Sequence, residues 1–262
     1  MSTPAIAFSG VAKRFAARGR SGEVLAVTDV NFAVQPGEVV SIIGPSGCGK
    51  STLLNMGSGL AKPSAGQVAV DGETVVGPNA HVAFMLQKDL LMPWRTIAQN
   101  IEFGLELRGV ASAERTRVST RLLNQCHLDG FGAHYPHQLS GGMRQRAALA
   151  RTLAVDPLVL LMDEPFSALD AQTKMILQQD LAQTVAKEGK TVLFITHDLA
   201  EAVALSDRIL VMSERPGTIV EQITVNLPER HNPMKRRKHD DLGRLVAQLM
   251  DLLKLDANTE VH

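Results

Sequence analysis

The sequence predicts an α/β fold with an inserted helical segment, and three observations predict it. Short apolar, β-branched runs such as Val39–Ile43 are typical of strands buried on both faces of a sheet. A glycine-rich loop follows that run and leads into a helix-like segment. Between residues 88 and 157, apolar residues recur at helical spacing instead. We therefore expect a sheet-based core that is interrupted by a helical subdomain.

The expected strands divide into an early group, which forms an antiparallel part, and a later buried group. In the helical segment, the apolar residues Ile97, Ile101 and Leu105 recur at the spacing of one face of a helix. We predict a nucleotide-binding core from residues 1–87 and 158–226, a helical subdomain from 88–157, and a helical tail from 227–262. The expected strands cover residues 5–8, 24–34, 39–43, 67–70, 81–85, 158–162, 191–195 and 208–212.

Composition and charge limit the classes of function. The chain has 262 residues, 45% of them hydrophobic and 21% charged, which is ordinary for a globular protein. Lys plus Arg and Asp plus Glu each total 27, so the basic excess typical of a protein that wraps nucleic acid is missing. We expect no nucleic-acid partner.

The cysteines and the apolar runs favour a cytosolic protein. Cys48 and Cys126 are too few for a disulfide framework and suit a reducing compartment. The apolar runs are too short to span a bilayer, and the start of the sequence lacks the pattern of a secretory signal. Any membrane connection is therefore expected to come through a partner.

A phosphate-binding loop is predicted between the strand 39–43 and the helix that begins near Lys50. The segment Gly44–Ser51 matches the pattern G-x-x-x-x-G-K-[ST]. Its glycines let successive N–H groups point at phosphate oxygens, Lys50 supplies a cation, and Ser51 supplies a hydroxyl for Mg²⁺. The pattern alone leaves an ATPase, a GTPase and a kinase open. The predicted nucleotide-binding residues here are Gly44, Pro45, Ser46, Gly47, Cys48, Gly49, Lys50, Ser51 and Thr52.

Two acids, Asp163 and Glu164, end the apolar strand 158–162. Adjacent carboxylates at that place are costly unless a cation or a substrate uses them. We predict that Asp163 holds Mg²⁺ and that Glu164 polarises the attacking water, although a solvated turn is the simpler alternative. His197 follows the strand 191–195, where α/β sheets place ligand-binding loops, so it is a candidate to contact the γ-phosphate or orient Glu164.

The segment Leu139–Arg146, with the sequence LSGGMRQR, resembles the signature of ABC-transporter ATPases. With the phosphate loop, Asp163-Glu164, Ser167–Asp170 and His197, it makes five motifs in the order of that family. The resemblance implies a P-loop NTPase core of the RecA-like kind that binds ATP and Mg²⁺. It also implies that Lys50, Glu164 and His197 take part in hydrolysis.

Further roles are implied by the same resemblance. Ser140, Gly141 and Gly142 of one copy would reach the γ-phosphate bound by another, which implies a homodimer through the ATP sites; their N–H groups at a helix start suit an anion. Gln87 matches the family's glutamine loop, which senses Mg²⁺ and the attacking water. Phe15 falls where the family stacks an aromatic ring on adenine, with a core phenylalanine as the alternative.

Two further segments, residues 88–100 and 215–228, resemble the corresponding segments in ATPase subunits of importers of nitrate, sulfonates and taurine. Such subunits work at the cytoplasmic face of the membrane with two permease subunits and, indirectly, an external solute-binding protein. An exporter subunit and a soluble ABC ATPase acting on nucleic acid or ribosomes are the alternatives. Four apolar residues form either a rim for a permease helix or part of the subdomain core: Leu90, Leu91, Met92 and Trp94.

Overall fold

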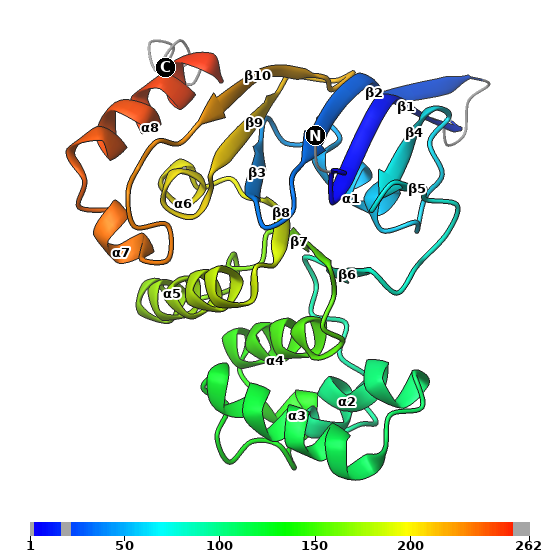
Figure 1. Ribbon diagram of the computed structural model, residues 1–262, viewed down its shortest axis with the longest axis vertical. Helices are drawn as coiled ribbons and strands as arrows, with labels where there is room; N and C mark the ends of the chain where they lie inside the picture. The colour runs from blue at the N-terminus through cyan, green and yellow to red at the C-terminus, as the bar shows by residue number, and fades with distance from the viewer. Residues whose placement is uncertain (1–2, 17–21, 254–262) are drawn as a thin grey trace.

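The computed structural model describes residues 3–16 and 22–253, and strands in this part form two sheets above stacked helices (Figure 1). The smaller sheet is antiparallel, with the order β2-β1-β4-β5. Its strands are β1 (Ile6–Ala16), β2 (Glu23–Val34), β4 (Ala65–Val70) and β5 (Glu73–Thr74). The antiparallel part expected from the sequence is therefore present.

The larger sheet has the order β10-β9-β3-β8-β7-β6, and every neighbouring pair except β9 with β10 is parallel. Helices connect its parallel strands, as parallel pairing requires. The α/β fold predicted from the sequence is confirmed. The strands are β3 (Val39–Ile43), β6 (Val82–Met85), β7 (Val159–Asp163), β8 (Thr191–Ile195), β9 (Arg208–Met212) and β10 (Ile219–Thr224).

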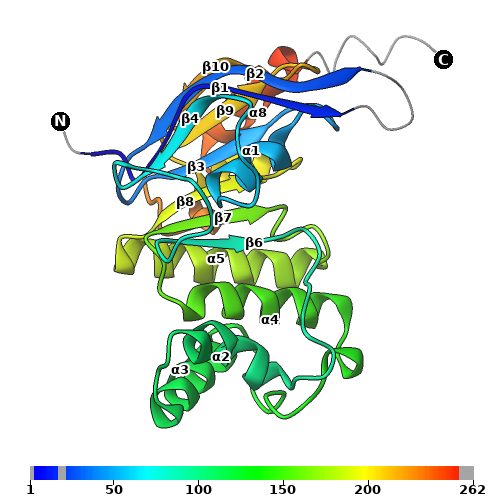
Figure 2. The same ribbon diagram turned by 90° about the vertical axis from the view of Figure 1, so that its right-hand side faces the viewer.

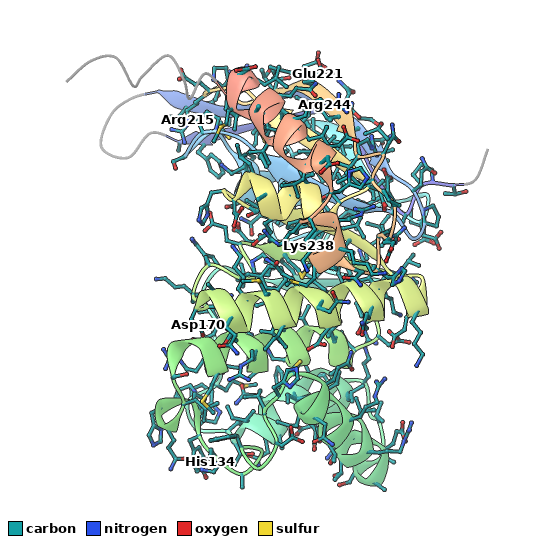
Figure 3. The ribbon with its side chains drawn as sticks, turned by 90° about the vertical axis from the view of Figure 1, so that its left-hand side faces the viewer. His134, Asp170, Arg215, Glu221, Lys238 and Arg244 are labelled. Atoms are coloured by element: carbon teal, nitrogen blue, oxygen red, sulfur yellow. The ribbon has the colours of Figure 1, made fainter. Side chains whose placement is uncertain are left out.

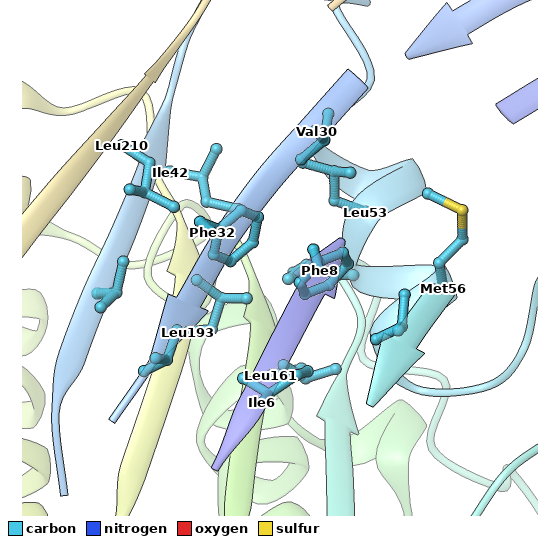
Figure 4. Packing of buried hydrophobic residues seen from close by; sticks show 14 of the residues in the cluster. Ile6, Phe8, Val30, Phe32, Ile42, Leu53, Met56, Leu161, Leu193 and Leu210 are labelled. Carbon is cyan, nitrogen blue, oxygen red and sulfur yellow. The ribbon is translucent and has the colours of Figure 1, made fainter. Parts of the chain in front are cut away.

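The central strands are buried because both faces of the larger sheet are covered. Leu193 in β8 points into a cluster shared with the smaller sheet and with helix α1 (Lys50–Gly57) (Figure 4). Phe194, the next residue, points to the opposite face, which helix α5 (Ala171–Glu188) covers. Phe8 and Phe32 stack between the two sheets with ring centroids 4.5 Å apart. This two-sided burial explains the continuous apolar runs in the sequence.

The segment between β6 and β7 is largely helical. Helices α2 (Ile97–Leu107), α3 (Ser112–Gln125) and α4 (Gly141–Ala154) share one apolar cluster, and a short 3₁₀ turn covers Pro136–Gln138. Helix α4 also packs its Ala148 and Leu149 against the larger sheet, and Figure 2 shows it between α5 and the α2–α3 pair. The proposed boundaries at residues 88 and 157 stay a prediction, because α4 belongs to both layers.

Some helices and strands were not predicted from the sequence, or only in part. Strand β10 pairs only with β9 and buries Ile223 alone, so its apolar pattern is weak. Strand β1 continues to Ala16, beyond the predicted end at Phe8. The prediction ended too early because the second half of the strand is largely exposed and therefore lacks an apolar pattern. Helices α5 and α6 (Leu199–Leu205) were also not predicted as separate elements. None of the helices in the described ranges has both the length and the apolar character needed to cross a membrane.

The tail packs against the core. Helix α7 (Pro233–Arg236) contacts α5 and α6, and α8 (Asp240–Leu252) contacts α6. A basic run such as residues 235–238 is usually a solvated face. Arg236 departs from this, because it is buried and donates to the backbone oxygens of Ser206 and Leu227 at 2.8 and 2.9 Å. Parts of the predicted core, residues 1–2 and 17–21, and of the predicted tail, residues 254–262, lie outside the described residues.

We expect Leu249→Ala to lower the free energy of unfolding by about 2–4 kcal/mol, because it leaves a cavity in the core. Leu249 in α8 has an exposure of 0%, whereas its neighbour Met250 has 39%. Met250→Ala is therefore the matched control and should change stability by less than about 0.5 kcal/mol. Urea unfolding followed by circular dichroism measures both. Equal losses would contradict the packing of α8 on the core.

Candidate functional site

The predicted phosphate loop connects β3 to α1, and its glycines take conformations that other residues rarely adopt. Gly47 and Gly49 have φ angles of +75° and +112°. A Cβ at Gly49 would also lie 2.3 Å from Cγ1 of Val27 in β2, so no side chain fits there. Gly49 is the N-cap of α1, and the helix N-terminus therefore opens directly on the loop.

Lys50 folds back over this loop. Its Nζ donates to the backbone oxygens of Gly44 and Pro45 at 2.7 and 2.8 Å. The ammonium group is thus held over the loop, and phosphate oxygens can replace the two carbonyls as its acceptors. Cys48 is different: its side chain is buried in the core, so only its backbone can face a phosphate.

Asp163 and Ser51 lie together beside the loop. Asp163 ends β7 and is largely buried. Burial raises the pKa of the Asp163 carboxyl, and this outweighs the hydrogen bond from Ser51 and the charge of Lys50, which act in the opposite direction. A carboxylate and a hydroxyl are oxygen ligands of the kind that Mg²⁺ prefers. Two of the three residues predicted from the sequence to hold the metal, Ser51 and Asp163, therefore fit it, and the third, Gln87, stays a prediction.

Two side chains that follow neighbouring parallel strands approach one carboxylate oxygen of Glu164, which follows the strand between them. Nε2 of Gln87, which follows β6, donates to Oε2 of Glu164 at 3.1 Å. Nδ1 of His197, which follows β8, lies 3.5 Å from the same oxygen. Because β6, β7 and β8 are adjacent and parallel, their carboxyl ends open on one edge of the sheet. The structure therefore brings together the trio that the sequence predicted, while the role of each residue stays a prediction.

The backbone at Glu164 is unusual. Its φ is +49°, which costs a non-glycine residue on the order of 1–2 kcal/mol. Hydrogen bonds hold it in place: its N–H donates to the oxygen of Ile195 at 3.1 Å, and its own oxygen accepts from Oγ of Ser167 at 3.0 Å. Strain of this kind is typical of positions where a side chain must be aimed.

The signature segment begins a helix, as the resemblance implied. Ser140 is the N-cap of α4, and its Oγ accepts from the N–H of Met143 at 3.3 Å. Gln145, one turn further, donates to the oxygen of Pro165 at 3.2 Å and so ties α4 to the segment after Glu164. Within the described part of the chain, the side-chain hydrogen bonds of residues 140–145 do not reach the phosphate loop. The exposed start of α4 is thus available to another molecule.

Phe15 lies on the exposed half of β1. Its exposure is 45%, and Nζ of Lys13 lies 5.2 Å from the centre of its ring. The alternative of a core phenylalanine is therefore excluded. Lys13 lies opposite Val27 of β2 in the strand register, and the side chain of Val27 packs against Gly49 of the phosphate loop. This end of β1 is therefore on the same side as the phosphate loop. Stacking on a base stays a prediction for Phe15.

Sequence reasoning missed a clamp on the loop that contains Gln87. Nε of Arg144 donates to Oδ2 of Asp89 at 3.0 Å, and Arg151 donates to the backbone oxygens of Asp89 and Leu90 at 2.7 and 2.8 Å. Both arginines project from α4. They are seven residues apart, which is two helical turns and hence one face, and this spacing was the available signal. The clamp connects the glutamine loop with the signature helix.

Comparison with known proteins finds ATP-binding proteins of ABC transporters that are similar to this chain. Residues 27–167 match the ABC transporter family. The chain is 50% identical over 204 residues to an uncharacterised ABC transporter ATP-binding protein of Methanocaldococcus jannaschii, covering 78% of this chain and 76% of that protein. It is 45% identical over 221 residues to the nitrate import ATP-binding protein NrtD of Synechocystis, covering 84% and 83%. It is 43% identical over 231 residues to the taurine import ATP-binding protein TauB of Yersinia pestis, covering 87% and 90%.

Solved structures resemble the fold as well. One is a dimeric ATP-binding cassette in a post-hydrolysis state, bound to ADP and phosphate. It aligns with a TM-score of 0.77 and 31% identity, covering 85% of this chain and 99% of that one. A second dimeric bacterial ABC transporter cassette aligns with a TM-score of 0.78 and 32% identity.

We expect Glu164→Gln to bind ATP, to hydrolyse it at least about a hundredfold more slowly, and to accumulate as a dimer, because the amide cannot accept a proton from water. Phosphate release and sedimentation velocity with ATP measure the two effects. Glu73→Gln is the matched control, since Glu73 is an exposed acid of the smaller sheet. Near-normal turnover by Glu164→Gln would remove Glu164 from the role of base.

Proposed function

Since the chain belongs to the ABC transporter family, and is thus an ATP-binding subunit whose ATPase activity is coupled to transport, we propose that it powers the import of a small solute through a membrane permease. The observation that carries this proposal is the convergence of Gln87 and His197 on Glu164, beside the phosphate loop. This arrangement gives one water molecule a base and two orienting groups next to the place for a γ-phosphate.

In the proposed site, each residue has a separate task. The N–H groups of the loop and Lys50 bind the β- and γ-phosphates. Ser51 and Asp163 would hold Mg²⁺, with Gln87 close to it, and the ion supplies charge neutralisation on the phosphates. Glu164 accepts the proton of the attacking water, and His197 keeps that carboxylate in position.

We propose that two copies complete each site. The exposed start of α4, with Ser140, Gly141 and Gly142, offers N–H donors and the positive end of a helix dipole to an anion. The hydrogen bonds of this segment do not join it to its own phosphate loop among the described residues, so a second copy is the natural source of the phosphate. The dimeric cassettes that resemble this chain support the same arrangement.

The proposed solute is nitrate, a sulfonate or taurine. The relatives named as nitrate and taurine import proteins cover most of this chain. The chain itself needs no contact with the solute, because the permease and an external binding protein select it. We place the subunit at the cytoplasmic face of the cell membrane, attached through two permease subunits.

The contact with the permease is proposed at the segment after Gln87. Trp94 is 73% exposed, and Leu90 is also exposed with a φ of +44°. Leu91, in contrast, is buried in the cluster of α2, α3 and α4, so of the two alternatives for this residue the subdomain core is the one observed. The rim is reduced to Leu90, Trp94 and the half-buried Met92. An exposed tryptophan next to the clamped loop is a suitable anchor for a partner.

The proposed function is tested by uptake of labelled nitrate, taurine and an alkanesulfonate in cells with and without the gene. Loss of uptake of one solute, restored by the intact gene but not by Lys50→Ala, is the expected result. Unchanged uptake of all three solutes would contradict the proposed solute class, but it would not contradict the assignment of the chain as an ATPase.

Replacing Trp94 with Ala should weaken binding to the permease by about thirtyfold, which corresponds to about 2 kcal/mol for a buried tryptophan anchor. ATP hydrolysis by the isolated chain should not change, because the side chain of Trp94 is exposed to solvent and is not one of the two side chains, Gln87 and His197, that lie against Glu164. Co-purification with a tagged permease measures binding. Leu107→Ala, at an exposed position of α2, is the control. Equal binding by the two variants would exclude Trp94 as an anchor.

A further inference from the structure

A buried polar network connects α5 with α6. Nζ of Lys174 contacts Oδ2 of Asp198 at 2.8 Å and Oε2 of Glu201 at 2.7 Å. The same Glu201 oxygen accepts from Nε2 of Gln178 at 2.8 Å. Glu201 and Gln178 are almost completely buried. Buried groups of this kind are costly when a partner is missing, so the network strongly favours one arrangement.

The network fixes the loop that contains His197. Asp198 is the next residue and the N-cap of α6, where its Oδ1 accepts from the N–H of Glu201 at 3.0 Å. Its own N–H donates to Oγ1 of Thr196 at 3.0 Å. His197 therefore lies between two residues whose side chains are held, while its own ring is largely exposed, with Nδ1 3.5 Å from Oε2 of Glu164. The position of the ring depends on the loop rather than on packing.

The tail completes this network. Nη2 of Arg237, just after α7, donates to Oε1 of Gln178 at 2.9 Å. That bond fixes which end of the Gln178 amide faces Arg237, and so directs the NH₂ group at Glu201. Figure 3 shows the labelled Lys238 next to α5, the helix that begins after the labelled Asp170.

The positive charge of Arg237 also acts on Asp198 and thereby on the loop that contains His197. Two acids, Asp198 and Glu201, share the single ammonium of Lys174. Burial raises the pKa of Asp198, but the hydrogen bond from Lys174 and the charges of Lys174 and Arg237 outweigh it and hold that pKa below its usual value. Without Arg237, the buried carboxylate of Glu201 and the partly exposed carboxylate of Asp198 would depend on one cation, and the loop around Asp198 would be less firmly held.

We infer that Arg237, a residue of the tail, is a positioning residue for His197: it orients Gln178, which with Lys174 holds Glu201 and Asp198 and thereby the loop of His197. This inference rests on the proposed role of His197 in hydrolysis. The tail then positions a residue of the site in addition to covering the core. Displacement of the tail by a partner would then slow hydrolysis without any change at the phosphate loop.

The tail does not need Arg237 for its attachment. Arg236 alone donates to three backbone oxygens, those of Ser206, Leu227 and Pro228, at 2.8, 2.9 and 3.2 Å. Leu245 and Leu249 of α8 pack into the core. Loss of the Arg237 side chain should therefore leave the tail folded, and an effect on hydrolysis can be separated from unfolding.

The test compares Arg237→Gln with Lys238→Gln in the full chain. Lys238 is the exposed neighbour, so its replacement removes the same charge from the same segment without touching the network. We expect Arg237→Gln to lower kcat about tenfold with the KM for ATP unchanged, since a small displacement of a catalytic group has effects of this order. Arg237→Lys should recover much of the loss, because its ammonium can donate to Gln178. Lys238→Gln should match the unmodified chain.

A spectroscopic measurement checks the route through His197. In the chain with ¹⁵N-labelled histidine, the His197 imidazole resonances, assigned by their loss in His197→Ala, should shift in Arg237→Gln and not in Lys238→Gln. An unchanged kcat, or a lower kcat with unshifted His197 resonances, would overturn the inference. An unmodified chain without ATPase activity would instead contradict the function itself, so the two failures are distinguishable.

Discussion

The structure depends on one constraint, the side-by-side parallel pairing of β6, β7 and β8 in a sheet that is covered on both faces. Parallel pairing makes the carboxyl ends of these strands open on one edge. The residues that follow them, Gln87, Glu164 and His197, must then meet there. Strand β3 belongs to the same sheet, so the phosphate loop that follows it opens on the same edge.

Helix α4 connects this edge to the rest of the chain. One of its faces packs with α2 and α3 and another packs on the sheet, so a movement of the helical layer moves the start of α4. Arg144 holds Asp89, two residues after Gln87, and Gln145 holds the segment after Glu164. The glutamine loop, the segment after Glu164 and the signature segment are therefore joined by hydrogen bonds through α4.

The sequence predicted the parts whose physical signal is local. Buried strands appear as apolar runs, and the phosphate loop and Asp163-Glu164 follow them directly, so their places could be predicted. The exposed strand β10 and the burial of Leu91 depend on contacts between distant segments, and no local pattern reports them. The spacing of Arg144 and Arg151 indicates that they share one face of a helix, but it does not indicate that Asp89 lies opposite that face. The same is true of Arg237, which belongs to a basic run that resembles a solvated surface and yet contacts Gln178.

The most direct test of the composite site is a crystal structure of the chain with Mg²⁺ and an ATP analogue that cannot be hydrolysed. The account predicts two copies head to tail, with Ser140 and the N–H of Gly142 of one copy within about 3 Å of the γ-phosphate bound at Lys50 of the other. A nucleotide enclosed by one copy alone, with Ser140 in solvent, would contradict it.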